Sequence, residues 1–134
     1  MTRQFDIAPT AAEMEAMMRA AWARLPEEFT SRAGDVVMLV EDFADAETLR
    51  MMEIEEPYEL TGLYEGIPLT ERSIEHSGTL PDKVRLFRMP ILLEWIERGD
   101  ETLEHLVAHV LIHEIGHHFG FSDDEMHALE DMVG

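Results

Sequence analysis

Apolar residues recur at helical spacing from Met14 to Leu25. They occupy positions i, i+3, i+4, i+7, i+8 and i+11, the pattern of one buried helix face: Met14, Met17, Met18, Ala21, Trp22 and Leu25. Thr10 and Glu13 form a capping-box pattern before this stripe, and Pro26 follows it. The pattern therefore predicts a helix between Thr10 and Pro26.

Two short segments have the composition of β-strands. Val36–Val40 is an uninterrupted apolar run whose length and β-branched content favour a buried strand. Lys83–Arg88 alternates basic and apolar residues over part of its length, which predicts a second strand. The acidic stretch Glu41–Glu59 is interpreted as a solvated face with one short helix near Glu47–Glu53. Glycines and a proline in Leu60–Ser77 favour loops and a brief strand.

The C-terminal third is predicted to hold a long helix between two shorter ones. Pro90 suits the first turn of a helix that Gly99 ends. Ser122 and Glu125 form a second capping-box pattern, which opens a final short helix. We find no internal repeat and no linker, so residues 1–134 are expected to form a single domain.

The long helix is placed from about Glu101 to Phe119. Asp100 is its predicted N-cap, and Gly120 is the residue predicted to end it. Apolar residues surround most of its circumference: Leu103, Leu106, Val107, Val110, Leu111, Ile112 and Ile115. A helix of this composition is expected to cross the core.

This helix carries the pattern H-E-x-x-H-x-x-G-x-x-D. His113 and His117 are four residues apart and share one helix face, within reach of a single zinc ion. Glu114 is rotated about 100° from His113, where it could take a proton from a zinc-bound water. Gly120 allows a left-handed exit from the helix, so Asp123 is the nearest candidate for a third ligand.

Chance occurrence and simpler roles are the alternatives to a zinc site. A chain of this composition contains the bare H-E-x-x-H roughly 0.05 times by accident, but the extended pattern only roughly 0.0002 times. His113 and His117 could instead be hydrogen-bonded core histidines, and Asp123 could be an acid favoured by a helix dipole. His105 and His109 continue the four-residue spacing and are interpreted as surface residues or supporting neighbours.

Charge and composition exclude several classes of function. The chain has 29 acidic and 10 basic residues, a net charge of −19, which opposes binding to nucleic acid and to anionic membranes. It has no cysteine, so disulfides and thiolate metal sites are excluded. No signal-peptide pattern and no membrane-spanning run is recognisable. We therefore expect a cytoplasmic protein, acting as a monomer.

The segment His113–Asp123 resembles the zinc motif of zincin metallopeptidases, in the Asp-zincin form with two histidines and one aspartate. More closely, the chain is similar to small bacterial proteins described as minimal zincin-like metallopeptidases. Gly62–Arg72 and Leu80–Asp82 carry the second part of this resemblance. It implies an α+β, minimal zincin-like fold in which a small mixed sheet packs on a central motif helix, with an edge strand bordering the cleft.

The resemblance also implies roles for individual residues. One zinc ion would be held by His113, His117 and Asp123, and Glu114 would be the catalytic base. Larger zincins add a group that stabilises the tetrahedral oxyanion. Tyr64, equally a packing candidate, is considered for that role here.

Three functions are compatible with these features. The first is a zinc metalloendopeptidase, a hydrolase acting on peptide or protein substrates, with Arg72 as a further candidate to stabilise the oxyanion. The second is a catalytically silent metal-binding regulatory or interaction protein, because little chain remains to build substrate pockets. The third is a metal-dependent ribonuclease, because a small bacterial endoribonuclease family has a similar motif that ends in a third histidine. Asp123 replaces that histidine here, and the acidic charge opposes RNA binding.

Overall fold

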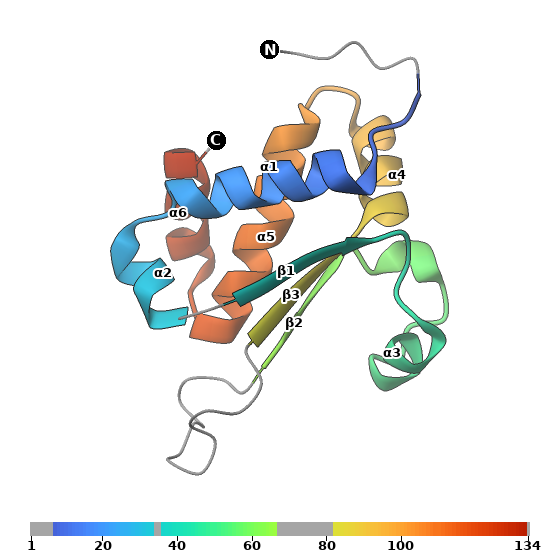
Figure 1. Ribbon diagram of the computed structural model, residues 1–134, viewed down its shortest axis with the longest axis horizontal. Helices are drawn as coiled ribbons and strands as arrows, with labels where there is room; N and C mark the ends of the chain where they lie inside the picture. Colours follow the sequence, from blue (N-terminus) through green and yellow to red (C-terminus); the bar gives the residue numbers. More distant parts are fainter. Residues whose placement is uncertain (1–6, 34–35, 67–81, 134) are drawn as a thin grey trace.

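The computed structural model describes residues 7–33, 36–66 and 82–133 (Figure 1). The elements follow one another in this order: α1 (Ala11–Arg24), α2 (Glu27–Ala33), β1 (Val36–Glu41), α3 (Ala46–Met51), the 3-10 turn η1 (Pro57–Glu59), β2 (Gly62–Glu65), β3 (Asp82–Phe87), α4 (Arg88–Arg98), α5 (Leu103–Phe119) and α6 (Asp123–Val133). The fold is α+β, as the sequence predicts.

The described strands form one small mixed sheet in the order β1-β3-β2. β1 pairs with β3 in parallel, with Met38 opposite Val84. β2 pairs with β3 in the antiparallel sense, with Tyr64 opposite the same valine. β2 is therefore an edge strand of the described sheet, and it is also the strand that lies along α5.

The core lies between one face of this sheet and the helices α1 and α5, which cross each other in Figure 1. The sheet contributes Met38, Val84 and Leu86, all buried. All seven apolar residues of α5 that the sequence pattern marks are buried as well, so the prediction that this helix crosses the core is confirmed. No helix among the described residues is long and apolar enough to span a bilayer.

Several predicted helix boundaries are confirmed, and one is wrong. The capping box of Thr10 and Glu13 starts α1, and Gly99 ends α4 in the left-handed conformation. The predicted N-cap Asp100 is wrong, because α5 begins two residues later than expected. Its N-cap is Thr102, whose hydroxyl accepts a hydrogen bond from the backbone N–H of His105. The residues around Asp100 connect α4 to α5 instead. Within this connection, the backbone carbonyl of Glu101 accepts a hydrogen bond from the indole N–H of Trp95 on α4.

Two short elements are absent from the sequence-based predictions. α2 starts directly after Pro26, whose carbonyl accepts hydrogen bonds from the N–H groups of Phe29 and Thr30. η1 has only three residues. Both elements are too short to show a periodic pattern of apolar residues.

The second face of the sheet carries a cluster of ion pairs around Arg85, whose exposed fraction is 8%. Its guanidinium donates hydrogen bonds to Glu41 at 2.6 Å, Glu65 at 2.7 Å and Asp45 at 2.9 Å. Hydrogen bonds from the Thr48 hydroxyl and from Arg85 hold the pKa of Asp45 well below its usual range. Most acids of the stretch Glu41–Glu59 are exposed, as the sequence predicts, and Glu41 and Asp45 also tie β1 and α3 to the middle strand.

Replacing Arg85 with methionine should destabilise the fold. Arg85→Met keeps most of the apolar stem but leaves three carboxylates close together without their cation, so we expect a loss of about 2–4 kcal/mol in the free energy of unfolding. Urea denaturation measures this loss. Arg19→Met is the matched control, because its ion pair with Glu15 lies on the surface and is worth less than about 1 kcal/mol. Equal losses in the two variants would contradict a structural role for the cluster.

Candidate metal centre

The end of α5 turns the chain back along its own path. Gly120 has a φ of 72°, and its N–H and that of Phe121 both donate to the Gly116 carbonyl. The left-handed exit predicted from the sequence is thus confirmed. Ser122 and Glu125 then exchange the two hydrogen bonds of the predicted capping box. As a result α6 packs against α5, which Figure 1 shows beside it.

Gly116, the glycine within the motif, has a packing reason. A Cβ at this position would lie 2.3 Å from the sulfur of Met126 and 2.7 Å from its Cγ. Met126 is buried on α6. A glycine in the middle of a helix costs about 1 kcal/mol relative to alanine. Here the missing side chain allows α5 and α6 to approach closely. This close approach determines where the polar residues of α6 lie.

The structure brings together His109, His113 and Glu130, one potential ligand atom from each lying within 4.8 Å of the others. The Nε2 atom of His113 is 3.5 Å from Oε1 of Glu130, and Nδ1 of His109 contacts the same oxygen. The two imidazole rings are tilted by 40°, with centroids 4.3 Å apart. Two nitrogens and one carboxylate oxygen are a donor set that suits zinc.

The predicted ligands lie along the same pair of helices. His113 is half-buried, His117 is exposed one turn further along α5, and Asp123 is exposed in the first turn of α6. Burial, together with the neighbouring charge of His109, lowers the pKa of His113, while Glu130 and Asp123 act in the opposite direction. A lowered pKa favours the neutral imidazole, which is the form that binds metal. The convergence of His113, His117 and Asp123 on one ion stays a prediction.

Glu114 lies between α5 and the edge strand β2. Burial raises the pKa of its carboxyl group, while His117 and a hydrogen bond from the backbone of Tyr64 oppose this shift. A Cβ on Gly62 would lie 2.9 Å from Val110 and 3.2 Å from Cγ of Glu114, so the strand approaches the helix closely because this residue is glycine. A carboxyl group with a raised pKa suits the transfer of protons near neutral pH.

Comparison with known proteins identifies the family. The model of the zincin-like metallopeptidase family matches residues 33–133, which include the sheet, α5 and α6. The chain belongs to the zincin-like metallopeptidase family. No curated protein matches it. Membership indicates a metal-dependent peptidase, and a group of potential ligands is present on α5 and α6.

The sequence pattern of this zincin-like protein does not identify two of the potential ligands, His109 and Glu130. His109 follows the four-residue spacing of the motif but was interpreted as a surface or supporting residue. Glu130 has no signal in the sequence, because its place depends on how α6 packs. Of the two oxyanion candidates, Tyr64 donates its hydroxyl to Asp82 at 3.0 Å, and Arg72 lies outside the described residues.

The packing role of Gly116 can be tested by a double-mutant cycle. Gly116→Ala should lower the free energy of unfolding by about 1–3 kcal/mol, because the added methyl group overpacks the contact with Met126. In a Met126→Ala background, the same substitution should stabilise the protein by up to about 1 kcal/mol through helix propensity. Urea denaturation of the four proteins measures both effects. An effect of the same sign in both backgrounds would contradict the proposed contact.

The buried carboxyl group of Glu114 should oppose folding when it is ionised. Its pKa in the folded state is raised above the ordinary value of 4.5, so the folded protein binds the proton more tightly than the unfolded chain. Glu114→Gln should therefore stabilise the metal-free protein at neutral pH, and the gain should vanish below about pH 4.5. Urea denaturation across this range, with exposed Glu97→Gln as control, measures the difference. A gain that does not depend on pH would argue against this cause.

Proposed function

We propose that the protein is a zinc-dependent metalloendopeptidase in which Glu114 acts as general base on a metal-activated water. The observation that carries the proposal is the position of Glu114, directly after His113 and between α5 and the edge strand β2, with its pKa raised by burial. A carboxylate in that position accepts a proton from the attacking water and returns it to the leaving amine.

The proposed ligands of the zinc ion are His113, His117 and Asp123. Their nitrogen and carboxylate donors fit zinc, and the lowered pKa of His113 supports a neutral, ligating imidazole. The bound ion would polarise the scissile carbonyl and activate a water. An extended peptide could align with β2, an edge strand that lies along α5. We further propose peptide or protein substrates, a monomeric state and a cytoplasmic location.

A metal-binding protein without turnover is the second candidate. One observation favours it: Tyr64, considered from the sequence as a group that stabilises the oxyanion, donates its hydroxyl to Asp82. In that case zinc binding would serve structure or regulation.

Peptide cleavage by the zinc-loaded protein tests the proposal. We expect a mixture of denatured proteins and peptides to be cleaved, with activity lost on adding a chelator and restored by zinc. Glu114→Gln should retain zinc and lower turnover by about 10²–10⁴-fold, because it removes the base and keeps the ligands. Exposed Glu104→Gln, on the same helix, is the matched control and should be as active as the wild type.

The outcomes separate the candidates. Retained turnover in Glu114→Gln would remove this residue as the base. A wild-type protein that binds one zinc ion and cleaves none of the substrates would favour the second candidate. His117→Ala should lose zinc from the peptidase position, as measured by cleavage and by metal competition.

A further inference from the structure

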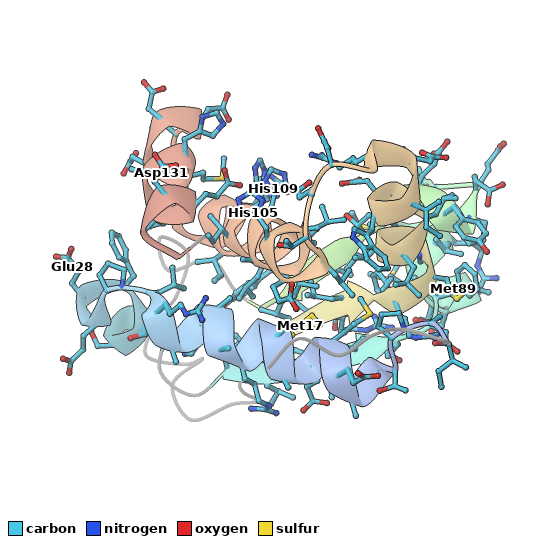
Figure 2. The ribbon with its side chains drawn as sticks, turned by 90° about the horizontal axis from the view of Figure 1, so that it is seen from above. Met17, Glu28, Met89, His105, His109 and Asp131 are labelled. Atoms are coloured by element: carbon cyan, nitrogen blue, oxygen red, sulfur yellow. The ribbon has the colours of Figure 1, made fainter. Side chains whose placement is uncertain are left out.

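We infer that His109, His113 and Glu130 form a second site for a zinc-like divalent cation, one that shares His113 with the proposed peptidase site. The sharing rests on the proposed function, but the three-residue site itself does not. Figure 2 labels His109 on the side of α5 that faces away from α1, the side on which α6 also lies. The site therefore spans the contact between α5 and α6.

The distance between His113 and Glu130 fits a tetrahedral ion. Zinc bonds of 2.0–2.1 Å at tetrahedral angles place two ligand atoms about 3.3 Å apart. The separation of His113 Nε2 and Glu130 Oε1 is 3.5 Å. The third ligand atom, Nδ1 of His109, lies within 4.8 Å of both and directly contacts Oε1 of Glu130, so the His109 ring has to turn away from this oxygen when an ion enters.

The burial of the ligand atoms is the second observation. Nε2 of His113 and Oε1 of Glu130 are both shielded from solvent, and neither makes a hydrogen bond among the described residues, although Nδ1 of His109 contacts the carboxylate oxygen. Buried polar atoms are normally hydrogen-bonded, and each exception needs an explanation. A cation between them satisfies the imidazole nitrogen and the carboxylate oxygen at once.

The side chains of the two histidines are partly exposed. The side chain of His109 is 30% exposed and that of His113 is 33% exposed, while Glu130 is covered to a greater extent. The ion would link two histidines of α5 to Glu130 of α6. It would therefore hold the C-terminal half of α6 against α5.

The two sites follow one another along the helix pair. His109, His113 and His117 stand at one-turn steps on α5, and α6 contributes Asp123 from its first turn and Glu130 from two turns later. The inference assigns Nε2 of His113 to both positions, and one imidazole nitrogen binds one ion, so this atom serves either position but not both. A cation held by His109 and Glu130 thus removes a ligand from the peptidase site, giving a metal-bound form without a complete catalytic centre.

Cobalt binding tests the inference without any measurement of turnover. The probe is Co²⁺, whose visible absorption reports tetrahedral coordination, titrated into a variant that combines His117→Ala with Asp123→Asn. We expect this variant to retain one equivalent of tetrahedral Co²⁺. Adding Glu130→Gln or His109→Gln should abolish that binding. The matched controls, Asp131→Asn and His105→Gln in the same background, should keep it, because both residues are exposed and outside the group.

Each result decides the matter. Loss of all Co²⁺ in the variant lacking His117 and Asp123, with its fold intact by circular dichroism, would overturn the inference. Retention of tetrahedral Co²⁺ after adding both Glu130→Gln and His109→Gln would also overturn it. Failure of the peptidase proposal is seen separately, as zinc-loaded wild-type protein without cleavage, and it leaves the cobalt result unchanged. The single variant Glu130→Gln should still bind one equivalent through the peptidase site.

Discussion

The burial of α5 against α1 and the sheet is the constraint on which the candidate site depends. The apolar residues of this helix fill the core, so its remaining faces are held in one orientation toward β2 and α6. His113 and Glu114 lie at the border of that buried region, where partial desolvation shifts their pKa values in opposite directions. The same packing that stabilises the fold therefore prepares an imidazole to bind metal and a carboxyl group to carry a proton.

On the sheet side of the site, ion pairs add to the apolar packing. Arg85 joins acids from both neighbouring strands and from the start of α3, and this cluster lies on the face opposite the core. Because β2 is an edge strand with only four residues, its pairing with β3 benefits from the link between Arg85 and Glu65. The position of β2 in turn determines what lies beside Glu114.

Local features of the site could be predicted from the sequence, and features that depend on packing could not. Gly120 and the box of Ser122 and Glu125 were predictable because each acts on backbone within a few residues. Glu41 lies 44 residues from Arg85, and no short-range pattern reveals that pair. Likewise, the grouping of Glu130 with His109 depends on the packing of α6, which follows from the contact between Gly116 and Met126. The wrong choice of Asp100 over Thr102 shows that two neighbouring cap residues can be distinguished only once the length of the connection is known.

The contact between Gly116 and Met126 also limits how this sequence can diverge. A side chain at position 116 requires a smaller one at position 126, because the space available holds only one of them. The two positions are therefore expected to vary together among relatives that keep this helix pair. In a relative with a larger residue at position 116 and an unchanged methionine at position 126, α6 would be displaced. The carboxylates of α6 that face the histidines would then be displaced with it.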